Sequence, residues 1–80
     1  MTDTVQVIIN GAKQPVPVGL NVSSLLAHLG IAGNRVAIER NLNLLPRTEW
    51  GQTAVLSGDT YEIVHLVGGG DTGRRLRFRP

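Results

Sequence analysis

Three consecutive glycines, residues 68–70, follow the last apolar segment of this 80-residue sequence. Glycine has the largest conformational entropy to lose on folding, so such a run marks an abrupt fall in backbone stiffness. We therefore expect one small β-rich domain over residues 1–67, a flexible glycine arm at residues 68–70 and a separate extension at residues 71–80. A folded unit of this length has no room for a second domain.

The charge of the chain divides at the same place. Residues 1–70 carry four basic and five acidic side chains, whereas residues 71–80 carry four arginines and one aspartate. The pI of about 9.9 thus comes from the last ten residues. We expect this basic extension to be disordered. Because the body is weakly acidic and poor in aromatic residues, we do not expect nucleic acid as a partner, and a small RNA-binding domain would have only the extension to support it.

The composition excludes several kinds of functional site. The sequence contains no cysteine, so it can form no disulfide, thiolate nucleophile or cysteine-ligated metal site. We interpret His28 as a solvent-facing residue of a short helix, and the sequence places no carboxylate or serine near His65. We therefore predict no catalytic residue and no metal site. The N-terminus lacks a basic segment followed by an apolar stretch, and no apolar run is long enough to span a bilayer. We expect a cytoplasmic protein with no membrane partner.

Apolar residues occupy alternate positions over residues 5–9, which is typical of a strand with one buried face. The Asn10-Gly11 dipeptide that follows tolerates the positive φ angles of a tight hairpin turn. A second strand is therefore expected over residues 14–18. It contains two prolines, which lack an N–H donor, and this places it at a sheet edge.

A helix is predicted from Val22 to Leu29, because Asn21 can cap its first N–H groups and Gly30 can end it. The other expected elements are a strand over residues 36–40, a short apolar piece at 44–45, a helical or 3₁₀ turn at 47–50, a brief strand at 53–56 and a last strand at 60–66.

One short helix and four or five strands pack most simply with the helix across one face of a mixed sheet. We predict an α+β fold of the β-grasp type, with the first and last strands parallel at the centre of the sheet. If Tyr61 and Ile63 point into the core, Val64 and Leu66 point outward. Together with Val67, they are the predicted partner-binding surface beside the glycine arm.

Three stretches carry a resemblance to a known family. Residues 58–70 read Gly-Asp-Thr-Tyr-Glu-Ile-Val-His-Leu-Val-Gly-Gly-Gly, and Leu-Pro-Arg-Thr-Glu-Trp at residues 45–50 follows Val-Ala-Ile-Glu-Arg-Asn at residues 36–41. With the Asn-Gly turn after the first strand, this combination resembles the ThiS family of sulfur carrier proteins of thiamine biosynthesis. The resemblance covers residues 5–70.

The resemblance implies a ubiquitin-like β-grasp carrier, not an enzyme, that binds no cofactor of its own. Its terminal glycine carboxylate is adenylated with ATP by a ThiF-like enzyme and converted to a thiocarboxylate. A sulfur donor such as a cysteine desulfurase supplies the sulfur, which passes to a ThiG-like thiazole synthase. By alignment of the glycines, Gly70 is the reactive residue. Gly68 and Gly69 are the arm, whose lack of Cβ atoms suits a narrow channel.

The extension departs from the family pattern, because Gly70 is joined by a peptide bond to Asp71 and has no free carboxylate. Our working hypothesis is a pro-segment that a processing protease removes. A natural extension on a protein with another function and an addition made during cloning are the alternatives.

Two other functions fit the same fold and the Gly-Gly end. One is a MoaD-like sulfur carrier for molybdopterin synthesis, although MoaD chains usually lack the Pro-Arg-x-x-Trp stretch found here. The other is a ubiquitin-like protein modifier or interaction module, in which residues 71–80 would be a precursor extension.

Overall fold

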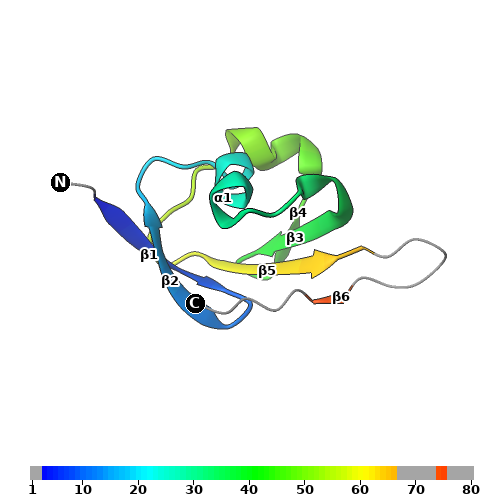
Figure 1. Ribbon diagram of the computed structural model, residues 1–80, viewed down its shortest axis with the longest axis horizontal. Helices are drawn as coiled ribbons and strands as arrows, with labels where there is room; N and C mark the ends of the chain where they lie inside the picture. The colour runs from blue at the N-terminus through cyan, green and yellow to red at the C-terminus, as the bar shows by residue number, and fades with distance from the viewer. Residues whose placement is uncertain (1–2, 67–73, 76–80) are drawn as a thin grey trace.

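The computed structural model describes residues 3–66 and 74–75 (Figure 1). In chain order the elements are β1 (Thr4–Ile9), β2 (Ala12–Pro17), α1 (Val22–Leu29), η1 (Gly33–Arg35), β3 (Val36–Arg40), β4 (Asn43–Leu45), η2 (Arg47–Gln52), β5 (Thr60–His65) and β6 (Arg74–Arg75), where η denotes a 3₁₀ helix. Within those ranges no helix has the length and apolar character that crossing a bilayer requires.

The first hairpin forms as predicted. Ile9 pairs with Ala12, which leaves Asn10 and Gly11 as a two-residue turn with φ angles of 49° and 86°. A turn this short allows pairing to begin at once, so β2 starts two residues earlier than expected. β2 lies at the edge of the sheet, as its prolines require.

The strands of the body form one mixed sheet in the order β2-β1-β5-β3-β4. β1 and β5 run parallel at its centre, and the neighbouring pairs are antiparallel. In Figure 1, α1 and η2 lie on the same side of this sheet. The predicted β-grasp architecture is thereby confirmed, including the crossover through the first hairpin and the helix.

α1 begins and ends at the capping residues expected from the sequence, Asn21 and Gly30. The side-chain oxygen of Asn21 accepts from the Ser24 N–H at 2.8 Å, and the Ser24 hydroxyl accepts from the Asn21 N–H at 2.9 Å. Gly30 adopts a left-handed conformation with φ of 75°. This pair of caps satisfies backbone groups that an eight-residue helix would otherwise leave open at both ends.

The core lies between α1 and the sheet and is almost wholly aliphatic. Its buried apolar side chains are Val7, Ile9, Val16, Val22, Leu25, Leu26, Val36, Ile38, Trp50, Val55, Tyr61 and Ile63. Burial of these aliphatic side chains is the main term favouring the folded state.

The Pro-Arg-x-x-Trp stretch has a structural role. Trp50 is buried in η2, and its indole N–H donates to the Leu45 carbonyl at 3.1 Å. The Arg47 guanidinium lies 4.6 Å from the centre of the Trp50 ring and donates to the carbonyls of Gly33 and Val36. Trp50 therefore packs in the hydrophobic core, and Arg47 contacts its ring and two backbone carbonyls.

The brief strand predicted at residues 53–56 is wrong. This segment makes a single bridge, between Ala54 and Asn21. Its backbone instead bonds to the loop before α1, where the Val55 N–H donates to the Leu20 carbonyl at 2.9 Å. Val55 is buried, so its apolar character reflects packing under α1 rather than a place in the sheet.

Asp59 is the one charged side chain buried among the described residues, and it joins β5 to β3. It accepts from the Tyr61 hydroxyl at 2.8 Å, from the Leu56 N–H at 2.9 Å and from the Asn41 amide at 3.2 Å. Arg40 completes the set with a salt bridge of 3.1 Å. The sequence alone suggested only a turn residue at this position.

These contacts shift the pKa values of both buried groups. Burial alone would raise the pKa of the Asp59 carboxyl, but the hydrogen bonds it accepts and the Arg40 charge hold that pKa below its ordinary value. Burial, helped by the hydrogen bond to Asp59, raises the pKa of Tyr61 to about 12. Asp59 is therefore ionised and Tyr61 neutral at neutral pH.

Asp59→Asn should destabilise the fold by about 1–3 kcal/mol at neutral pH. The substitution removes the negative charge that pairs with Arg40, and it places an amide NH₂ donor among groups that themselves donate, such as the Tyr61 hydroxyl. The pKa of Asp59 is lower in the folded state than in the unfolded state. The stabilisation of the fold by Asp59 is therefore complete at pH values above its unfolded-state pKa of about 3.9, and it is lost as the pH falls through its folded-state pKa. Urea unfolding at several pH values measures the difference between the two proteins.

That difference should shrink toward about pH 3. A difference that stays constant between neutral and acidic pH would contradict the assigned network. Asp3→Asn is the matched control, because Asp3 is exposed, and its effect should stay within about 0.5 kcal/mol.

Candidate functional site

The predicted reactive residue Gly70, the arm residues Gly68 and Gly69 and the predicted contact residue Val67 lie outside the described residues. What the structure describes is the base from which they continue, the end of β5 at His65 and Leu66. The geometry of this base decides how the chain enters the glycines.

One edge of β5 is paired with β3 along its length. The register runs from Tyr61 opposite Arg40 to His65 opposite Val36. One residue further, the Leu66 N–H donates to the Arg35 carbonyl at 2.7 Å. The backbone is therefore held in place up to the last residue described before the glycines.

The other edge of β5 is held by β1 and then by a side chain. Parallel pairing with β1 reaches Tyr61. Beyond it, the Asn10 side-chain amide donates to the Ile63 carbonyl at 3.1 Å, and its oxygen accepts from the Ile63 N–H at 2.8 Å. Asn10 thus extends the pairing of β1 by one position, a role that its place in the turn gave no sign of.

Past Asn10, this edge of β5 is paired with the C-terminal extension. β6 runs antiparallel to β5, with Arg75 opposite Val64 and Arg74 opposite His65. At these two positions the structure departs from the disorder expected for residues 71–80. The reason is that an open strand edge offers unpaired N–H and C=O groups that a second segment can satisfy. For residues 71–73 and 76–80, which are not described, disorder stays a prediction.

The side chains of β5 alternate as expected. Tyr61 and Ile63 are fully buried, Val64 is half-buried, and Leu66 is 41% exposed. Val64 and Leu66 are thus accessible beside the base of the glycines. Their contact with a partner, together with that of Val67, stays a prediction.

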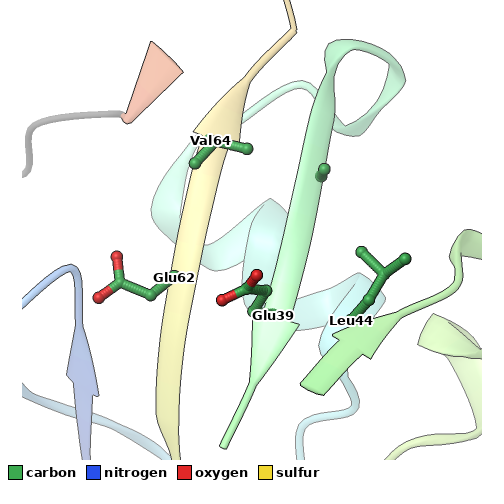
Figure 2. A pocket seen from close by; sticks show the side chains of 5 residues that line it. Glu39, Leu44, Glu62 and Val64 are labelled. Carbon is green, nitrogen blue, oxygen red and sulfur yellow. The ribbon is translucent and has the colours of Figure 1, made fainter. Parts of the chain in front are cut away.

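A groove of about 330 Å³ lies on the face of the sheet turned away from α1 (Figure 2). It is lined by Ala37, Glu39, Leu44, Glu62 and Val64. Glu39 and Glu62 are direct cross-strand partners on β3 and β5. The groove thus combines apolar walls with two carboxylates, which suits a ligand that is both apolar and positively charged. In the described part of the chain, no three metal-ligating side chains are grouped to hold an ion.

A model of the ThiS family matches residues 4–70 of the sequence. The chain belongs to the ThiS family. This confirms the family resemblance found in the sequence, and it agrees with the β-grasp fold described above. The match includes all three glycines and ends at the third.

A solved structure supports the same assignment. The crystal structure of the thiamine biosynthesis protein ThiS from Geobacter metallireducens superposes with a TM-score of 0.71 and 34% sequence identity. The superposition covers 82% of this ThiS-family chain and all of that protein. An uncharacterised protein, ycf40 of Porphyra purpurea, is 35% identical over 82% of this chain and 93% of its own length.

Two longer proteins contain a similar segment. Thiazole synthase of Paramagnetospirillum magneticum is 40% identical over 65 residues, and thiazole synthase of Magnetococcus marinus is 36% identical over 62 residues. These alignments cover about four fifths of this chain, which spans only about a fifth of the length of each synthase.

Asn10→Gly should loosen β5 without disturbing the hairpin, because glycine tolerates the positive φ of this turn while removing the side chain that holds Ile63. We expect a loss of about 1 kcal/mol in the free energy of unfolding. Amide hydrogen exchange should accelerate at Ile63, whose N–H bonds to Asn10. The amide of Ile38, inside β3, is the internal control. Unchanged protection at Ile63 would contradict this role of Asn10.

Proposed function

We propose that this chain carries sulfur as a thiocarboxylate on Gly70 for the synthesis of the thiamine thiazole, after residues 71–80 have been removed. The observation that carries the proposal is the family match, which ends at Gly70, the last of the three glycines. Residues 4–70 match the family model, and residues 71–80 lie beyond it.

The proposed chemistry needs a free carboxylate on Gly70. Hydrolysis of the Gly70–Asp71 peptide bond by a protease would supply it. The carboxylate then attacks ATP on a ThiF-like enzyme, which forms the acyl-adenylate and releases pyrophosphate. A donor such as a cysteine desulfurase carries sulfur as a protein persulfide, whose terminal sulfur displaces AMP to give an acyl disulfide. A thiol reductant then cleaves the S–S bond and leaves the thiocarboxylate. All these steps take place on partner enzymes, and this chain supplies the acyl group.

The geometry of β5 supports this function. A carboxylate that must enter another protein's active site benefits from a slender arm on a fixed base. The Ile63 N–H donates to the Asn10 side chain and the Leu66 N–H donates to the Arg35 carbonyl, so the backbone is held close to the glycines. Residues without Cβ atoms then impose no side-chain volume on the channel that receives them.

Thiazole synthase is the proposed acceptor of the sulfur. The support comes from the two proteins named thiazole synthase that contain a segment similar to most of this chain. A carrier-like segment within such a protein would hold the two activities at high local concentration. A separate carrier would meet its acceptor by diffusion and would need a docking surface.

The direct test compares two forms of the chain, one ending at Gly70 and the full 80 residues. Each is incubated with ATP, a sulfide source and the adenylating enzyme, and its intact mass is measured. The shorter form should exchange one oxygen for one sulfur, and the full chain should stay unmodified because it has no carboxylate at Gly70. Failure of the shorter form to gain sulfur, with an active enzyme, would contradict the proposal.

Val64→Asp and Leu66→Asp, each in the form ending at Gly70, should weaken docking to the adenylating enzyme, because both put a charge on an accessible apolar position beside the arm. We expect KM for the carrier to rise by about tenfold or more, equivalent to about 1.4 kcal/mol, with kcat little changed. Val18→Asp is the matched control, since Val18 is an exposed apolar residue distant from β5. Equal effects at all three positions would exclude a local docking surface.

A further inference from the structure

We propose that Arg47 is a positioning residue for the glycine arm, because it fixes the backbone of η1 to which the end of β5 is bonded. Leu66 is the last residue described before the glycines, and its N–H donates to the Arg35 carbonyl at 2.7 Å. The direction in which the chain leaves β5 therefore depends on where Arg35 is held. The effect on sulfur transfer rests on the function proposed above, whereas the effect on Leu66 does not.

The Arg47 guanidinium binds the backbone on both sides of Arg35. It donates to the carbonyl of Gly33, the first residue of η1, and to the carbonyl of Val36, the first residue of β3, the latter at 3.2 Å. A guanidinium presents several N–H donors in a rigid planar fork, so one side chain can bond two acceptors at fixed positions. The Arg35 carbonyl lies between these two points in the chain and accepts instead from Leu66.

β4 does not reach this end of β3. The pairing of β3 with β4 covers only the last three residues of β3, and Val36 lies beyond it. The chain leaves β4 through Pro46, which has no N–H to donate, and enters η2. The Arg47 side chain therefore supplies Val36 with the kind of donor that a longer β4 would have supplied, much as the Asn10 side chain extends β1.

Trp50 anchors the guanidinium of Arg47 to the core. The centre of the Trp50 ring lies 4.6 Å from the guanidinium carbon, and only 5% of Trp50 is exposed. Gly33 packs closely against the same ring, since a Cβ atom added to this glycine would lie 3.1 Å from it. A continuous path of contacts thus runs from the Trp50 ring through Arg47 and η1 to Leu66.

A fixed base matters for the step that follows docking. The adenylating enzyme must place the terminal carboxylate of the carrier against ATP, and misplacing a reacting group by about 1 Å can cost about 100-fold in rate. Docking through the accessible residues of β5 does not require Arg47. Loss of the Arg47 contacts therefore lowers kcat and leaves KM for the carrier nearly unchanged.

Amide hydrogen exchange in the full-length chain tests the positioning itself. Arg47→Met removes both donors, and exchange at the Leu66 amide should accelerate by about tenfold. The Ile63 amide, which bonds to Asn10, should keep its protection and is the internal control. Arg35→Met is the matched variant and should leave Leu66 unchanged, because Arg35 is exposed and bonds Leu66 through its backbone carbonyl.

Kinetics of the form ending at Gly70 test the effect on the reaction. With the adenylating enzyme, ATP and a sulfide source, Arg47→Met should lower kcat by about tenfold and change KM for the carrier by less than about twofold. Arg47→Lys should behave in the same way, because an ammonium keeps the charge but lacks the planar fork. A role in overall stability alone would leave kcat of the folded variant unchanged, and Arg35→Met should leave both constants unchanged.

Three results would overturn the proposal. The first is full protection of Leu66 in Arg47→Met, the second is an unchanged kcat for this variant, whatever its KM, and the third is equal effects of Arg47→Met and Arg35→Met. If the unsubstituted form ending at Gly70 gains no sulfur, the proposed function fails. The exchange at Leu66 then decides alone whether Arg47 fixes the end of β5.

Discussion

The parallel pairing of β1 with β5 is the contact on which the rest of the structure depends, since it joins the first and last strands of the body at the centre of the sheet. Such pairing needs a crossover, which the first hairpin and α1 provide, and α1 is thereby laid over one face. Side chains then hold β5 where strand pairing alone would not. The Asp59 contacts tie its start to β3, and Asn10 continues β1 as far as Ile63. A strand held on both edges can support a reactive arm at its end.

The two faces of the sheet differ in what covers them. One is closed by α1 and the aliphatic core. The other is open around Glu39, Glu62 and Val64, directly beside the strand that leads to the glycines. A carrier must be recognised by successive partners at one place, and a surface adjoining its reactive end serves each of them.

The predictions that succeeded rest on local signals. Asn21 and Gly30 bound α1 to the residue, and Asn10-Gly11 makes the two-residue turn, because capping and positive φ depend on neighbours in the sequence. What the sequence missed depends on contacts between distant residues. Asn10 reaches Ile63 across 53 positions, and Arg40 reaches Asp59 across 19. β6 was missed for the same reason, since its pairing requires an edge left open by the end of β1. Residues 53–56 are the reverse case, because Val55 is buried in the core while its segment makes a single bridge instead of a strand.

The central claim is that Gly70 becomes the sulfur-bearing end of this chain, and the most direct measurement is the mass of the protein isolated from the cells that make it. Fragmentation of the intact protein locates both the terminus and the sulfur. We predict a population that ends at Gly70 and has one carboxylate oxygen of that residue replaced by sulfur. A population in which every chain retains residues 71–80 in cells actively making thiamine would contradict it.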